Sequence, residues 1–198
     1  IFLVFLRPLG LRLHSAWVTA KGEKMSKSLG NGLSVPAVLA ENSAWVVRYA
    51  LGSVQYRSML EWSDQTLTEA QSAYDRVSNF IERAGAAVGG QPSREEIVSV
   101  SADDLPTDFV AAMNDDINVS GASAAIFTAI RSGNTLLSKL ADRVDSDVAK
   151  DEVRAVLVNV RAMLDTLGLD PLAEPWVSEG AAGAAGAGAD SAEHTALD

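Results

Sequence analysis

The sequence contains no cysteine and only two histidines, His14 and His194, which are far apart in the chain. The lack of cysteine excludes a disulfide framework and every metal site that needs a thiolate ligand. It also agrees with a reducing compartment, and we expect a cytoplasmic protein. Two separated histidines offer no zinc-binding spacing, so we predict no metal site in this chain.

Long hydrophobic runs are missing as well. The apolar run at residues 1–6 is followed directly by Arg7 and Pro8. It is much shorter than the ~20 apolar residues that a helix needs to cross a bilayer. No basic segment precedes it, so it does not match a secretory signal peptide. We therefore expect no membrane partner.

Basic residues are few: 16 lysines and arginines stand against 26 aspartates and glutamates, a formal net charge of -10. An acidic chain is a poor general binder of nucleic acid, so a contact with RNA requires a local basic patch. One such patch lies near the start of the chain, opposed there only by Glu23. Its members are Arg7, Arg12, Lys21, Lys24 and Lys27.

Apolar residues recur at helical spacing, and the hydrophobic share of 47% is enough to build a core in this chain of 198 residues. A short β-prone run at residues 17–19 precedes the helices. We predict helices over residues 34–40, 43–52, 63–88, 105–113, 120–140 and 147–167, the fifth with a possible break at Gly133. The long amphipathic helices favour an antiparallel bundle, so the fold is mainly α.

Two stretches between the predicted helices need an interpretation. Residues 91–104 contain a proline and four acidic residues, and we predict a surface connection. Asp115 and Asp116 could be read as metal ligands or as acid and base. No histidine or further carboxylate lies at a supporting spacing, so we predict that they cap the helix that follows.

The chemistry is concentrated in residues 24–31. Lys24 and Lys27 are three positions apart and are separated by a methionine and a serine. Such a loop can close over a polyphosphate and neutralise charge as it develops at the α-phosphate of a nucleotide. Ser26, Ser28 and backbone N–H groups would add neutral donors. The alternative is a solvated turn that happens to carry lysines.

Residues 24–31, which read KMSKSLGN, resemble the KMSKS signature of class I aminoacyl-tRNA synthetases. Further stretches are similar, in the same order, to cysteinyl-tRNA synthetases: residues 13–18, 22–23, 47–53, 55–58 and 113–118. The chain departs from the family pattern at Gln55, where a histidine is common, and at Ile117 and Val119.

The resemblance implies a domain organisation. Residues 1–33 would be a remnant of a class I catalytic domain with the KMSKS loop, and residues 34–62 the stem-contact region. Residues 63–172 would form a helical bundle on the tRNA-binding side, followed by a flexible Gly/Ala-rich tail at 173–198. Nothing in residues 1–10 resembles the family. We therefore expect a truncation, a frameshifted reading or an artificial junction there, with a plain buried strand as the alternative.

The resemblance also implies an activity: ATP-dependent activation of cysteine, with Mg²⁺, and transfer of cysteine to tRNA-Cys by a monomeric enzyme. Lys24 and Lys27 would be catalytic. The implied ATP-binding residues are Lys24, Met25, Ser26, Lys27 and Ser28, and the implied tRNA contacts are Arg48, Tyr56 and Arg57. The parent enzyme would hold zinc, whose ligands are absent from this chain, and we expect the isolated chain to be inactive.

Three alternatives remain open. The first is the related ligase that joins cysteine to an amino sugar in mycothiol synthesis. The second is another class I synthetase, because the signature is shared among them. The third is a noncatalytic helical module that binds tRNA or a partner protein.

Overall fold

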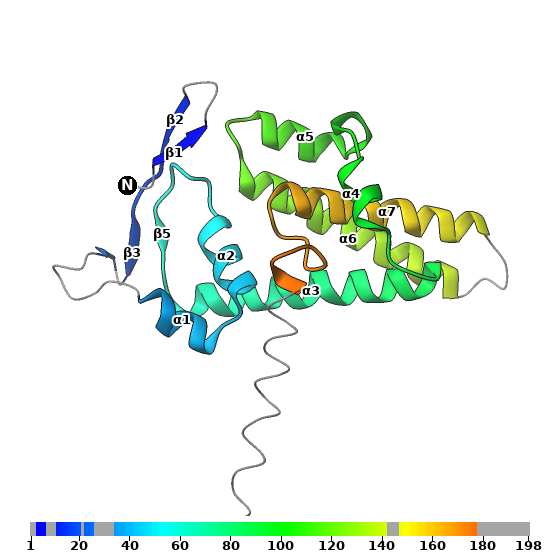
Figure 1. Ribbon diagram of the computed structural model, residues 1–198, viewed down its shortest axis with the longest axis horizontal. Coiled ribbons are helices and arrows are strands. Elements are labelled where there is room, and N and C mark those ends of the chain that lie inside the picture. Colours follow the sequence, from blue (N-terminus) through cyan, green and yellow to red (C-terminus); the bar gives the residue numbers. More distant parts are fainter. Residues whose placement is uncertain (1–2, 7–10, 21, 26–33, 142–146, 178–198) are drawn as a thin grey trace, which may run out of the picture.

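The strands and the long helices lie at opposite ends of the molecule (Figure 1). The computed structural model describes residues 3–6, 11–20, 22–25, 34–141 and 147–177. Most of these residues are helical, which confirms the mainly α fold class. The helices are α1 (Val35–Glu41), α2 (Ala44–Gly52), α3 (Asp64–Val88), α4 (Arg94–Val98), α5 (Thr107–Asn114), α6 (Val119–Ala141) and α7 (Asp147–Thr166).

Helices α3, α5, α6 and α7 form the bundle. Consecutive helices α5, α6 and α7 alternate in direction (Figure 1), and α7 packs against both α6 and α3. The largest fully buried side chains include Phe80, Leu157 and Met163. A Cβ atom at Gly133 would lie 2.4 Å from the Phe80 ring, so α6 needs a residue without a side chain there. Helix α6 continues through this position without the break that was considered.

Local capping signals set several helix ends as predicted. The Ser63 hydroxyl accepts a hydrogen bond from the Thr66 N–H at 3.2 Å, and α3 ends at Gly89 with φ of +82°. The Ser43 hydroxyl accepts from the Val46 N–H at 3.3 Å at the start of α2. Ser34, which we expected to cap α1, stands before the helix but its side chain makes no such bond, so this expectation was wrong.

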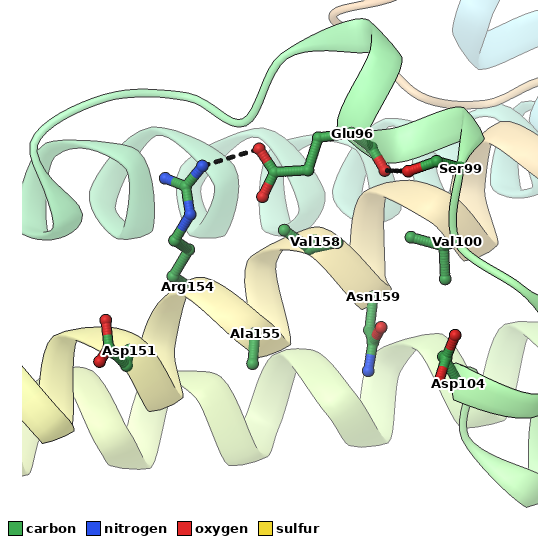
Figure 2. Close-up of a pocket in the computed structure, with 9 residues that line it drawn as sticks. All are labelled: Glu96, Ser99, Val100, Asp104, Asp151, Arg154, Ala155, Val158 and Asn159. Atoms are coloured by element: carbon green, nitrogen blue, oxygen red, sulfur yellow. Dashed lines mark hydrogen bonds and ion pairs between the residues drawn. The ribbon is translucent and has the colours of Figure 1, made fainter.

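Residues 91–104 are mostly exposed, as predicted for a surface connection, but the prediction missed their regular structure. This segment contains α4 and a short 3-10 helix at Ala102–Asp104. The Ser93 hydroxyl accepts from the Glu96 N–H, and Ile97 is only 2% exposed. Figure 2 shows Arg154 of α7 donating to the Glu96 carboxylate at 2.7 Å. Capping, one buried side chain and this ion pair make the short helix stable.

The prediction that Asp115 and Asp116 cap the next helix was also wrong. The side chain at the start of α6 that accepts a backbone bond is Asn118, from the Gly121 N–H at 2.9 Å. Asp116 and Ile117 have left-handed backbone angles, φ of +51° and +55°. These angles turn the chain between α5 and α6. The Asp116 carboxylate therefore points away from α6 and binds residues that precede α3.

The strands form two small sheets. Strands β1 (Leu3–Leu6) and β2 (Leu11–His14) pair antiparallel, so residues 3–6 of the first apolar run form a strand, and that this strand is buried stays a prediction. In the second sheet β3 (Val18–Ala20) is central, with β4 (Glu23–Lys24) antiparallel and β5 (Leu60–Glu61) parallel to it. This sheet carries Lys24, the first lysine of the motif.

Among the described helices, none is both long and apolar enough to cross a membrane.

The bundle contains a buried ion pair. Arg161 of α7 donates to both carboxylate oxygens of Asp170, at 3.2 and 2.9 Å, and the two side chains are 3% and 0% exposed. Arg161 also donates to the Pro92 carbonyl at 2.8 Å. This guanidinium therefore joins α7, the segment after it and the segment before α4.

We predict that Asp170→Asn destabilises the chain by about 3–5 kcal/mol, because it leaves the Arg161 charge buried without its partner. Urea unfolding followed by circular dichroism measures the change. The matched control is Asp147→Asn, whose carboxylate lies 3.9 Å from Lys150 on the surface, and we expect it to cost about 0–1 kcal/mol. Equal midpoints for the two variants would contradict this account.

Candidate functional site

The first lysine of the motif lies on an edge strand. Lys24 pairs with Thr19 across the β3–β4 hairpin, and the Met25 N–H donates to the Val18 carbonyl at 3.1 Å. The tight turn between the strands uses Gly22, whose φ of +77° favours glycine. The hairpin therefore fixes where the chain enters the motif.

The hairpin turn is held from β5 by Glu61. Its carboxylate accepts from the Thr19 hydroxyl at 2.6 Å and from the Gly22 N–H at 3.2 Å. These two bonds tie the central strand, the turn and β5 together. The sequence reasoning missed Glu61, because no motif marks a glutamate whose partners lie about forty residues earlier.

The Lys24 ammonium lies over the face of Trp17, 3.3 Å from the ring centroid. Trp17 is 43% exposed, and a cation–π contact at such a site is worth about 0.5–1 kcal/mol. So weak a contact orients the ammonium without locking it.

The structure places two of the five predicted ATP-binding residues, Lys24 and Met25. Ser26, Lys27 and Ser28 lie outside the described residues, so their roles stay predictions. Met25 is half-buried next to the sheet, whereas Lys24 is exposed.

A mainly apolar hollow of about 390 Å³ adjoins the Lys24–Trp17 pair. Its walls come from β3, the end of α2, the loop before β5 and the turn between α5 and α6. They include Trp17, Leu51, Tyr56, Leu60 and Ile117. The sheet therefore meets the bundle through β3 and β5, and the lysine strand β4 lies on the other edge of the sheet.

Two of the three predicted tRNA contacts, Tyr56 and Arg57, both bind the carboxylate of Asp116. The Tyr56 hydroxyl donates to Asp116 at 2.7 Å, and Arg57 Nε lies 2.9 Å from the same carboxylate. The hydrogen bond with Tyr56 and the charge of Asp116 raise the pKa of Arg57. The Gln55 amide donates to the Asp116 carbonyl at 3.2 Å. We call Gln55, Tyr56, Arg57 and Asp116 the Asp116 cluster.

The third predicted contact, Arg48, lies elsewhere. Its Nη2 donates to the Leu167 carbonyl at 3.1 Å, near the end of α7. A Cβ atom at Gly168 would lie 2.5 Å from the same nitrogen, so the guanidinium packs closely on this helix end. Arg48 therefore joins α2 to α7, and a role at RNA stays a prediction.

Among the described residues, no group of three or more histidine, aspartate or glutamate side chains is arranged to hold a metal ion. What the site offers is an exposed ammonium on an edge strand, an apolar hollow beside it, and an arginine and a tyrosine fixed by one carboxylate. Such groups can bind and neutralise anions.

Models of protein families match two parts of the chain. Residues 9–72 match the class I (C) tRNA synthetase catalytic domain, and residues 108–171 match the DALR domain. The first match contains the lysine strand, the hollow's sheet wall and α2. The second contains α5 to α7 with Asp116.

Three curated relatives share one name. The chain is 82% identical over 94% of its length to the cysteine–tRNA ligase of Bifidobacterium longum. It is 50% identical over 86% of its length to that of Beutenbergia cavernae and 43% identical over 85% to that of Streptomyces avermitilis. The chain covers 34%, 34% and 33% of these proteins, about a third of their length.

A solved structure shares the fold. The ternary complex of agnB2 LeuRS-tRNA-LeuAMS from Agrobacterium radiobacter K84 matches with a TM-score of 0.53 at 19% identity. The match covers 83% of this chain and 23% of that one, and it supports the fold alone. The two family matches and the high identity to curated ligases agree: the chain belongs to the cysteinyl-tRNA synthetase family.

Proposed function

We propose that this chain acts as part of a cysteine–tRNA ligase, in which it supplies the lysine loop for cysteine activation and a helical bundle for tRNA. The observation that carries the proposal is the 82% identity to the Bifidobacterium longum cysteine–tRNA ligase over 94% of the chain. Since the chain spans a third of that protein, activity requires the remainder. The isolated chain is inactive in this proposal, and the enzyme is a cytoplasmic monomer.

In the first step the cysteine carboxylate attacks the α-phosphate of ATP. A bond forms between carboxylate oxygen and phosphorus, and the bond to pyrophosphate breaks. Negative charge grows on the phosphate oxygens, and the ammonium groups of Lys24 and Lys27 neutralise it. Ser26, Ser28 and backbone N–H groups donate neutral hydrogen bonds, and Mg²⁺ accompanies the nucleotide. Lys24 leaves the Trp17 face to take part.

In the second step a hydroxyl at the 3′ end of tRNA-Cys attacks the cysteinyl carbonyl, and AMP leaves. The bundle and the Asp116 cluster hold the sheet that carries Lys24 while the tRNA is bound. Zinc in the parent enzyme has no ligands from this chain, which contains no cysteine. In this proposal, the residues of this chain therefore act on the phosphates of ATP and on the RNA.

Two other functions are weighed against this one. The mycothiol-pathway ligase would join cysteine to an amino sugar, and a noncatalytic module would bind tRNA or protein without chemistry. The match of residues 108–171 to the DALR domain and the common name of the relatives favour the tRNA ligase. An acceptor assay with tRNA-Cys and with an amino sugar, carried out on this chain joined to the remainder of a full-length enzyme, separates the three.

The experiment that tests the proposal uses a chimera in which residues 9–171 replace the matching segment of the Bifidobacterium longum ligase. We predict cysteine-dependent ATP–pyrophosphate exchange, and a decrease of about 10²–10³ in its rate for Lys27→Ala, the range for losing one transition-state donor. Lys150→Ala, on α7, is the control. A decrease smaller than about threefold for Lys27→Ala would place the chemistry elsewhere.

The Asp116 cluster gives a second prediction in the same chimera. Asp116→Asn removes the charge that holds Arg57, and the sheet loses one attachment to the bundle. Arg57 and Asp116 are 67% and 45% exposed, so the effect is modest. We predict a rate of cysteine activation about three- to tenfold lower than for Asp115→Asn, the neighbouring control, and recovery with Asp116→Glu. Equal rates for the two asparagine variants would count against this role.

A further inference from the structure

Three side chains stand in a row across the sheet that carries Lys24. Lys24 of β4 is the register partner of Thr19 of β3, and Thr19 is the register partner of Glu61 of β5. Opposed residues of neighbouring strands project from the same face of a sheet. Trp17, two residues before Thr19, belongs to this face too, which agrees with the position of the Lys24 ammonium over its ring. The face therefore holds a lysine at one edge and a carboxylate at the other.

The two oxygens of the Glu61 carboxylate bind two different parts of the hairpin. One accepts from the Thr19 hydroxyl at 2.6 Å, and the other accepts from the Gly22 N–H at 3.2 Å. Thr19 lies opposite Lys24, and Gly22 makes the turn two residues before it. Hydrogen bonds to an ionised group are stronger than those between neutral groups. The carboxylate thus fixes the strand of Lys24 both from across the ladder and from the turn.

The backbone of Glu61 is held in turn by the start of α3. Its carbonyl accepts from the Thr66 hydroxyl at 2.9 Å, in the first turn of the helix. The Thr66 hydroxyl also lies 3.0 Å from the hydroxyl of Ser63, the residue that caps α3. Because α3 packs against α2 and α7, Glu61 stands on a rigid base.

The strand of Lys24 is short, so it depends on contacts from outside the hairpin. Strand β4 has two residues, Glu23 and Lys24, and both are exposed. It therefore buries little side-chain surface of its own. A hairpin of two strands is at best marginally stable in water without further packing. The bonds from Glu61 are thus well placed to decide the orientation of β4.

We propose that Glu61 is a positioning residue for the cysteine-activation step. The inference rests on the proposed function, in which the Lys24 ammonium neutralises charge on the α-phosphate of ATP, and it names the residue that sets where this ammonium stands. Glu61 acts through Thr19 and Gly22 and makes no contact with the nucleotide or the amino acid. A preorganised group stabilises a transition state because it needs no rearrangement as charge develops. A lysine strand that shifts loses part of this benefit.

The test measures ATP–pyrophosphate exchange in the chimera that carries residues 9–171. Glu61→Gln removes the charge and leaves one oxygen where the carboxylate has two. Thr19→Val keeps the branched shape of the side chain and removes its hydroxyl. The matched control is Glu69→Gln, on the exposed surface of α3, because Glu69 also accepts a bond, from the Gln65 amide at 2.8 Å, and its variant loses the same charge.

We expect kcat to be about tenfold lower for Glu61→Gln and less reduced for Thr19→Val, which loses one of the two bonds. KM for ATP should not rise, because a carboxylate repels the nucleotide. Glu69→Gln should stay within about twofold of the unaltered chimera. In a Lys24→Ala background, Glu61→Gln should change the rate by no more than about twofold, because the ammonium that it positions is gone.

Three kinetic results would overturn the proposal. The first is an equal rate for Glu61→Gln and Glu69→Gln. The second is a loss from Glu61→Gln that is the same with and without Lys24, since this would show a general effect on the sheet. The third is a higher KM for ATP with unchanged kcat.

Amide hydrogen exchange in the 198-residue chain tests the inference separately from the proposed function. The Met25 N–H, which donates to the Val18 carbonyl, reports on the strand of Lys24. We expect Glu61→Gln to accelerate its exchange at least about fivefold and to leave an amide in the middle of α3 unchanged. Unchanged protection of Met25 would overturn the positioning role whatever the activity. An unaltered chimera that lacks ATP–pyrophosphate exchange would count against the proposed function alone.

Discussion

The way the sheet and the bundle of the described residues are joined depends on the burial of Trp45 of α2. The indole is 2% exposed, stacks on Tyr49 at 5.3 Å between centroids and meets Tyr74 of α3 edge-on at 5.0 Å. Its N–H donates to the Leu169 carbonyl at 2.8 Å. One side chain thereby joins α2, α3 and the segment after α7. Because the loop from α2 leads directly into β5, this contact also sets the position of the sheet that carries Lys24.

The Asp116 cluster attaches the sheet to the bundle at a second point, in addition to the docking of α2 through Trp45. Asp116 lies between α5 and α6 and holds Tyr56 and Arg57, while the Ser120 hydroxyl donates to the Ser53 carbonyl at 3.1 Å. The Tyr56 carbonyl in turn accepts from the Ala16 N–H at 2.8 Å, just before β3. Two attachments restrict rotation as well as translation. A loop that must meet a nucleotide on one side and RNA on the other benefits from such a rigid support.

Sequence alone predicted the features that rest on neighbouring residues. The apolar stripe of α3, the cap at Ser63 and the glycine after α3 act within one or two turns, and these were found. The helix at Arg94–Val98 could have been predicted, because Ser93 and Glu96 have the spacing of a capping box. The bonds of Asp116, Glu61 and Arg48 could not, since their partners lie far away in sequence and depend on packing.

Amide hydrogen exchange in Trp45→Ala tests most directly whether α2 docking holds the sheet. The Leu60 and Trp62 N–H groups donate to the Trp17 and Thr19 carbonyls, at 3.2 and 2.7 Å, and report on the sheet. An amide in the middle of α7 reports on the bundle, and Trp45→Phe is the variant that keeps an aromatic ring but loses the indole N–H. The account predicts that exchange at Leu60 and Trp62 accelerates at least about tenfold more than in α7, with a smaller difference in Trp45→Phe. Unchanged protection of the sheet, or equal acceleration in sheet and α7, would contradict it.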